Sequence, residues 1–151
     1  MSISNHVLVG STIALAIRQP VYALPLAFMS HFVLDSIPHF GFRASGFKVA
    51  FRQRVFYVFE VFDLIGLIVI LATINYSLLL PLLGALCALA PDFEWAFRYY
   101  FYERKDKEGP RRTRLTKFHQ FIQWGERPWG AFVEIGVFIG VYIILKNFVL
   151  R

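Results

Sequence analysis

The sequence predicts an all-helical, polytopic integral membrane protein, and both its composition and its longest apolar runs lead to this prediction. Of its 151 residues, 57% are hydrophobic and 18% aromatic, and the mean hydropathy is +0.53, whereas soluble domains are only about half apolar. Runs such as Leu64 to Ile74 and Val133 to Ile144 have no polar face to turn toward water. We therefore expect lipid to cover much of the chain.

Five apolar segments predict about five hydrophobic helices in a single transmembrane domain over residues 1–151. They cover residues 6–18, 21–37, 55–76, 78–97 and 129–149, and polar connections occupy residues 38–54 and 98–128. Crossing a bilayer takes about 20 residues, so the last three segments are long enough. The first two are shorter, and we expect them to form a tight or re-entrant hairpin at Arg18-Gln19-Pro20.

The basic residues predict the orientation in the membrane. Four lie between Arg43 and Arg54 and eight between Arg98 and Lys117, together 12 of the 16 Lys and Arg. Because such residues concentrate on the cytoplasmic side, both connections and the N-terminus are predicted to be cytoplasmic. Basic charge there attracts anionic lipid headgroups, which we favour over nucleic acid as a partner. Residues 115–124 have the helical apolar spacing of a short helix lying in the interface.

The start of the chain and its single cysteine give two further expectations. Met-Ser-Ile-Ser-Asn-His has neither the basic region nor the cleavage site of a secretory signal, so we expect the first apolar segment to remain in the mature protein. Cys87 lies among apolar residues, as a packed helix thiol does. One cysteine excludes an internal disulfide and a thiolate cluster as a metal site.

Ionisable residues lie within or beside the apolar segments, where each costs several kcal/mol of insertion free energy. Projected onto the predicted topology, every His and nearly every such carboxylate falls near the cytoplasmic face. The group comprises His6, His31, Asp35, His39, Glu60, Asp63, Asp92, Glu94, His119 and Glu134. Because only Lys and Arg were used to set the orientation, this clustering indicates a single site.

The densest stretch is Ser30 to Phe40, which contains His31, Asp35 and His39. Residues four apart share one helical face, so the first two can bind one cation. His39 would lie about 12 Å from His31 in a straight helix. Pro38 disfavours helical geometry at the preceding residue, so we expect a break that returns His39 to the site or presents it to a second ion.

Pro91 predicts a second helix break, immediately before Asp92. A divalent ion would supply the positive charge that so many His and carboxylate groups need. Imidazole and carboxylate ligands without thiolate suit zinc best, with manganese or iron as alternatives. The candidate ligands are His6, His31, Asp35, His39, Asp92 and His119. Structural hydrogen bonding is the alternative role for each, and Glu60, Glu94 and Glu134 suit outer partners of the ligands or counter-ions of the basic loops.

These motifs resemble the membrane-bound metal-dependent hydrolases, a family of small polytopic bacterial proteins. The resemblance lies in Asn5-His6-Val7-Leu8-Val9-Gly10, in Ser30-His31-x3-Asp35-x2-Pro38-His39 and in Leu89-Ala90-Pro91-Asp92. It covers roughly the first two-thirds of the chain and implies an inner-membrane location. Family members continue the last motif to a second Asp and a His, where this chain has Glu94 and Trp95. Their later His-Arg-x-x-Thr-His element is reduced here to Phe118-His119-Gln120, so the resemblance implies a divergent branch.

The resemblance implies hydrolysis, and the interfacial site suggests an ester or phosphoester of a lipid-like substrate. Asp63 or Glu94 could accept the proton, and Arg43 or Arg98 could hold a headgroup phosphate. A metal-ion or proton-coupled transporter is an alternative, because chains of His and carboxylates also build ion paths. A third possibility is a non-catalytic membrane scaffold in which a metal joins the helices.

Overall fold

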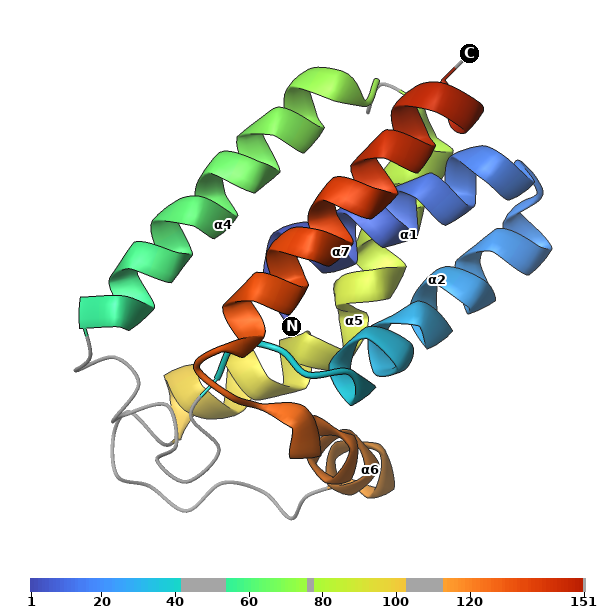
Figure 1. The fold of residues 1–151 in the computed structure, drawn as a ribbon. Coiled ribbons are helices and arrows are strands. Elements are labelled where there is room, and N and C mark those ends of the chain that lie inside the picture. Colours follow the sequence, from blue (N-terminus) through green and yellow to red (C-terminus); the bar gives the residue numbers. More distant parts are fainter. Residues whose placement is uncertain (42–53, 76–77, 103–112, 151) are drawn as a thin grey trace.

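A computed structural model describes residues 1–41, 54–75, 78–102 and 113–150, and this part of the chain is all-helical (Figure 1). The elements are α1 (Ile3–Ile17), α2 (Pro20–Ser36), α4 (Arg54–Thr73), α5 (Leu79–Phe101), α6 (Arg114–Ile122), a 3₁₀ turn η2 (Gln123–Gly125), α7 (Gly130–Ile144) and a π-helical end η3 (Leu145–Val149). All five predicted apolar segments are helices, and the short helix predicted at 115–124 is α6.

Helices α1 and α5 cross closely enough to require small residues. A Cβ atom added to Gly10 would lie 2.4 Å from the Gly84 carbonyl oxygen, and one added to Gly84 would lie 2.5 Å from that of Gly10. Ala88 and Ala14, four residues further along, line the same contact. Small residues spaced four apart on both helices let the backbones meet, as in membrane helix pairs.

Helices α1 and α2 form the predicted hairpin. Arg18 ends α1 in the left-handed region, at φ 60° and ψ −8°, and its N–H donates to the Ala14 carbonyl. Pro20 opens α2 at a position where its missing N–H costs no helical bond. Both helices pack on α5, so this antiparallel pair with α5 forms the centre of the bundle.

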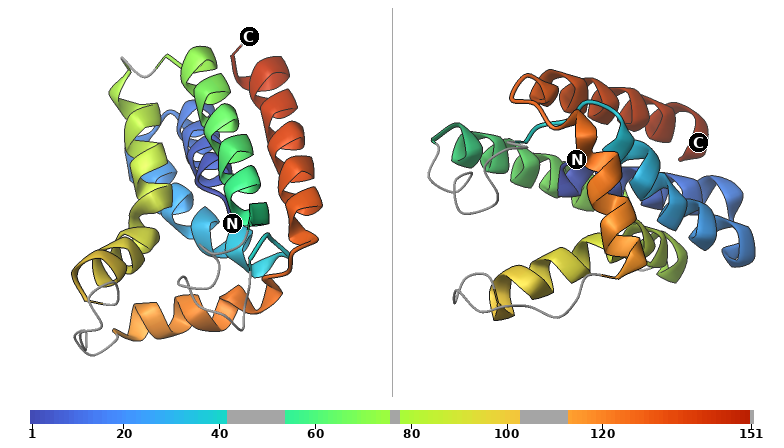
Figure 2. Two further views of the ribbon diagram at one scale, coloured as in Figure 1. Left: turned by 90° about the vertical axis from the view of Figure 1, so that its left-hand side faces the viewer. Right: turned by 90° about the horizontal axis from the view of Figure 1, so that it is seen from below.

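Pro38 and Pro91, the two prolines predicted to break helices, have different effects. Helix α2 ends at Ser36 and Ile37 is extended, at φ −85° and ψ 157°, which confirms the break predicted before Pro38. The break predicted at Pro91 is wrong, because α5 continues through it to Phe101. A proline removes one backbone hydrogen bond and can bend a helix without ending it, and α5 changes direction along its length (Figure 2).

Helices α4 and α7 lie on the outside of this centre and contact it mainly through α1 (Figures 1 and 2). Both expose large apolar side chains: Ile65 and Ile68 of α4 are 51% and 57% exposed, and Phe132 of α7 is 79% exposed. Among the described residues, one helix, Gly130–Val149, is long and apolar enough to cross a membrane, with 20 residues and a mean hydropathy of 1.9.

Helix α6 lies across one end of the bundle (Figure 1). Thr113 caps its start by accepting the Thr116 N–H at 3.1 Å. One face buries Thr116, His119 and Ile122, while the other exposes Leu115, Phe118 and Phe121. The buried face of α6 therefore directs His119 toward the bundle.

The segment just before α7 is hydrogen-bonded to the chain that follows α2. The His39 N–H donates to the Gly125 carbonyl at 3.4 Å, and the Arg127 N–H donates to the His39 carbonyl at 2.9 Å. A Cβ atom on Gly130 would lie only 2.1 Å from the His39 carbonyl carbon, so this position requires glycine. The break at Pro38 therefore brings the chain against the start of α7.

Candidate metal centre

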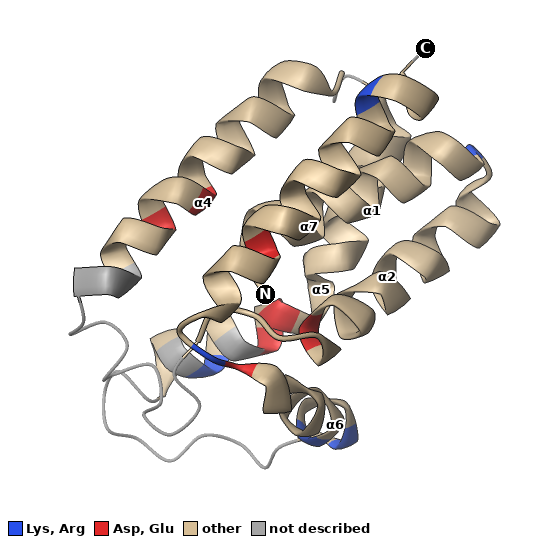
Figure 3. Ribbon diagram, in the orientation of Figure 1, with Lys and Arg blue, Asp and Glu red and all other residues tan. Residues whose placement is uncertain are grey.

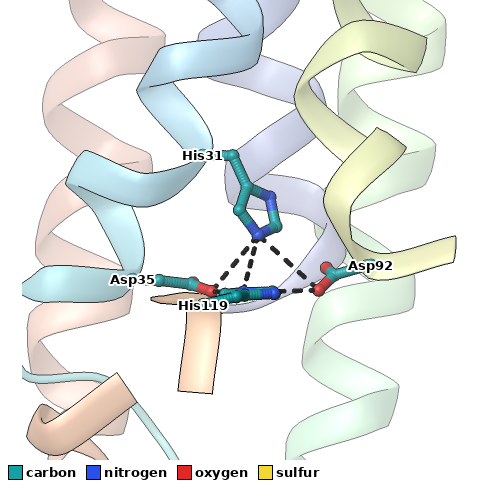
Figure 4. Close-up of side chains that lie close together, drawn as sticks. All are labelled: His31, Asp35, Asp92 and His119. Carbon is teal, nitrogen blue, oxygen red and sulfur yellow. Dashed lines mark hydrogen bonds and ion pairs between the residues drawn. The ribbon is translucent and has the colours of Figure 1, made fainter. Parts of the chain in front are cut away.

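Four of the predicted ligands converge from three helices. His31 and Asp35 come from α2, Asp92 from α5 and His119 from α6, and one ligand atom of each lies within 4.8 Å of the others (Figure 4). His31 and Asp35 meet because they are four residues apart on one helical face. Asp92 and His119 are brought in by packing, since they are 61 and 88 residues from His31 in the sequence.

The two imidazoles and Asp35 are in direct contact. His31 Nε2 and His119 Nε2 lie 2.9 Å apart, and Asp35 Oδ2 lies 2.7 Å from His119 Nε2 and 3.3 Å from His31 Nε2. Asp92 Oδ1 stands slightly further away, at 3.6 Å from His31 Nε2 and 3.9 Å from His119 Nε2. Ligand nitrogens and oxygens therefore surround one point.

The hydrogen bond of the other His31 nitrogen fixes how this ring is protonated. His31 Nδ1 lies 2.7 Å from the Ala88 carbonyl oxygen, which can only accept, so Nδ1 carries the hydrogen. In the neutral ring Nε2 is then a lone-pair acceptor aimed at His119 and Asp35. Orientation of a ligand histidine by a backbone carbonyl is typical of metal sites.

Burial makes a cation at this point favourable. His31 and His119 are 0% and 1% exposed, and Asp35 is 1% exposed, so the carboxylate needs a compensating charge. The Met1 amino group supplies part of it, 2.6 Å from Asp35 Oδ1. Two imidazoles, two carboxylates and no thiolate fit a divalent transition ion. The described residues can thus hold a metal ion, whose identity they leave open.

Access to the group is from one side. The Asp92 side chain is 36% exposed, whereas those of its three partners are buried. A catalytic metal site keeps one position open for water or substrate. The edge beside Asp92 is the side from which water or a substrate can approach the group.

His6 and Gln123 lie directly beside the four residues. The His6 ring stacks on that of His31 with centroids 4.2 Å apart, and His6 Nε2 lies 3.2 Å from Asp35 Oδ1. Gln123 Nε2 lies 3.2 Å from His119 Nε2 and 3.4 Å from Asp35 Oδ2. Sequence reasoning missed Gln123, although its place four residues after His119 could have indicated it.

His39 is outside the group of four, even though the predicted turn forms. Its Nδ1 atom donates to the Ile37 carbonyl at 2.9 Å, so the ring is used to stabilise the turn itself. Burial lowers the pKa of His39 from its ordinary value, which keeps the ring neutral at pH 7.

The proposed catalytic and headgroup residues are also outside the group. Asp63 on α4 accepts the Ser4 N–H at 3.0 Å, and Glu94 accepts the Thr113 hydroxyl at 3.2 Å. Arg98 is in the last turn of α5, six residues beyond Asp92. Arg43 lies outside the described residues.

Glu134 links distant segments of the chain and is not one of the four candidate ligands. It is 2% exposed, and its two oxygens accept the N–H groups of Ser2 and Phe40, each at 2.8 Å. This carboxylate therefore joins α7, the N-terminal segment and the turn after α2. These two hydrogen bonds go to backbone N–H groups, whereas an outer partner of the metal ligands would bond to a ligand side chain. Figure 3 shows how the acidic residues gather toward this end of the bundle.

Comparisons of the chain with protein-family models, curated proteins and solved structures give no match. The resemblance to membrane-bound metal-dependent hydrolases therefore rests on the short motifs quoted above.

Proposed function

We propose that the protein is a membrane-embedded, divalent-metal-dependent hydrolase that acts on an ester or phosphoester of a lipid-like substrate. The observation that carries this proposal is the convergence of His31, Asp35, Asp92 and His119 around one point, with one exposed edge. A hydrogen bond from His119 Nε2 to His31 Nε2 is the alternative explanation of their 2.9 Å contact, and the metal analysis below separates the two.

A membrane location is supported by the outer surface of the bundle. Helices α4 and α7 expose isoleucine and phenylalanine side chains along their length, and a large exposed apolar surface marks a contact with a membrane or another protein. Helix α6 adds exposed Phe118 and Phe121 beside Arg114 and Lys117, a combination suited to an anionic lipid surface. We place the metal centre just beneath this surface, on the cytoplasmic side of a bacterial inner membrane.

The roles of the residues follow from burial. His31, Asp35, Asp92 and His119 would hold the ion, zinc being the best fit, and a bound ion lowers the pKa of a water and stabilises charge on the oxygen under attack. Asp92 lies at the exposed edge, so a substrate would approach the ion from its side. Glu94 and Arg98 follow on the same helix, so we keep them as candidates for proton transfer and headgroup binding. Asp63, held by Ser4, is better explained by the structural role.

The first test is the metal content of detergent-purified protein. We expect about one equivalent of zinc in the wild type and in His39→Ala, and loss of zinc in His119→Ala. His39 is a matched control because it is buried like His119 but lies outside the group. Equal zinc in both variants would exclude the centre.

The second test measures turnover of phosphoester and carboxylic-ester lipids in mixed micelles. We expect hydrolysis by the zinc-loaded wild type and none by His119→Ala. A protein that binds zinc through these residues and hydrolyses nothing, but moves zinc or protons into liposomes, would be a transporter. Zinc binding with neither activity would indicate a metal-joined scaffold.

A further inference from the structure

A second position for a cation lies beside the group of four, at the other oxygen of Asp35. Asp35 Oδ2 is the oxygen that pairs with His31 and His119, whereas Oδ1 lies 3.2 Å from Nε2 of His6. The Met1 amino group lies 2.6 Å from the same Oδ1 atom. Positive charge is therefore already accommodated on this side of the Asp35 carboxylate.

The His6 ring is fully buried, and its nitrogens make no hydrogen bond. His6 is 0% exposed, and both Nδ1 and Nε2 are without a hydrogen-bond partner in the part of the chain that the structure describes. Asp35 Oδ1 is close enough to Nε2, but it lies outside the direction that a hydrogen bond requires. A buried polar atom of this kind calls for an explanation, and an ion between Nε2 and Asp35 provides one.

The stacking of His6 on His31 sets the distance between two ions. The two rings are nearly parallel, with an interplanar angle of 17° and centroids 4.2 Å apart. Each ring presents its Nε2 atom to a different oxygen of Asp35, at 3.2 Å for His6 and 3.3 Å for His31. Ions bound in the planes of the two rings would therefore be about 4 Å apart, and two-metal sites hold their ions about 3.5–4 Å apart.

We infer that Asp35 bridges two divalent ions and that His6 Nε2 is a ligand of the second ion. Two ligand atoms at about 2.1 Å from one zinc ion, in tetrahedral geometry, lie about 3.4 Å apart, close to the 3.2 Å between His6 Nε2 and Asp35 Oδ1. The inference rests on the proposed metal centre but not on hydrolysis. Only these two side chains are assigned to the second ion, against four for the first, so the second ion should bind more weakly. It should add to the single equivalent expected in the purified protein.

Equilibrium dialysis of the detergent-purified protein against rising zinc concentrations tests the inference. We expect the wild type to bind a second equivalent after the first. His6→Phe keeps a ring against His31 but removes both nitrogens, so it should bind the first equivalent and lose the second, and His6→Ala should do the same. His39→Ala, which removes a buried histidine that is not near Asp35, should bind both.

The outcomes of the dialysis separate this inference from the proposed centre. A wild type that saturates at one equivalent, or a His6→Phe protein that binds two, would overturn the second site and leave the first. Loss of the first equivalent in both His6 variants, with wild-type helical circular dichroism, would assign His6 to the first ion and also overturn the inference. A wild type that binds no zinc would refute the centre itself.

Manganese in place of zinc distinguishes a bridged pair from two separate sites. Two Mn²⁺ ions about 4 Å apart and joined by one carboxylate are magnetically coupled. Wild-type protein with two equivalents of Mn²⁺ should therefore give the electron paramagnetic resonance spectrum of a coupled pair, whereas His6→Phe should give that of an isolated ion. An isolated-ion spectrum from wild-type protein that has bound two equivalents would overturn the bridging role of Asp35.

Discussion

The two sides of helix α1 differ in how they are packed. Toward α5 the backbones meet through Gly10 and Gly84, with Ala14 and Ala88 on the same faces. Toward α4 and α7, Ser4 bonds to Asp63 and Ser2 to Glu134 beside a cavity. Further along the same side, side chains form an apolar core that includes Leu8, Ile70 and Leu145. Close packing of two backbones tolerates no added volume, whereas the side toward α4 and α7 is less completely filled at the cavity. The comparison therefore contrasts a contact between two backbones with contacts made by side chains.

The strongest test of this contrast is to add volume where α1 meets α5. Gly84→Leu places side-chain atoms where a backbone carbonyl lies 2.5 Å away, so we expect the free energy of unfolding to fall by about 3 kcal/mol or more. Thermal unfolding in detergent, followed by helical circular dichroism, measures this. Gly136→Leu is the control, because nothing lies within 4 Å of a Cβ atom there. Similar losses in both variants would refute the contrast.

On the side toward α4 and α7, the Glu134 carboxylate should carry most of the polar connection. Glu134→Gln replaces one oxygen by an NH₂ group that faces a backbone N–H instead of accepting from it. We expect a loss of about 2 kcal/mol, the range for hydrogen bonds to a charged group. Glu60→Gln, at an exposed position on α4, should change stability by no more than about 0.5 kcal/mol. A Glu134 variant as stable as the Glu60 variant would show that the polar contacts contribute little.

The bend of α5 connects the tight contact with the metal centre. Pro91→Ala restores a backbone N–H and lets the helix straighten, which should move Asp92 and weaken zinc binding about tenfold, as read from a chelator titration. Pro81→Ala is the control, because Pro81 lies in the first turn of the same helix, where its missing N–H has no partner to lose. If both variants bind zinc like the wild type, the bend does not position Asp92.

The smallest expected effect concerns His39 and pH. Burial lowers the pKa of His39 in the folded state, whereas the unfolded value is about 6.5. Below that pH the unfolded chain binds the extra proton, so stability should fall on acidification. His39→Gln should reduce this loss by less than about 1 kcal/mol between pH 7 and pH 5. Identical pH profiles for wild type and variant would show that His39 does not contribute.

The local sequence pattern was sufficient to predict several features of the fold and site. Apolar runs located all five hydrophobic helices, and Pro38 located the end of α2, because a proline acts on the residue before it. The spacing of four between His31 and Asp35 brought them to one face. The helical spacing of the apolar residues in 115–124 predicted α6. Each of these depends only on residues within a turn or two of one another.

What the sequence did not determine depends on contacts between distant segments. Whether Pro91 ends or bends α5 depends on its neighbours, and here the helix continues. The spacing of His39 could not reveal that its ring would bond to Ile37 while Gln123 approached the ligands. The partners of Asp63 and Glu134 are backbone groups more than 50 residues away. The sequence by itself determined the helices and the ligand types, because these follow from local sterics and donor chemistry. Only the tertiary structure decided which side chains share one point, because helix packing sets those distances.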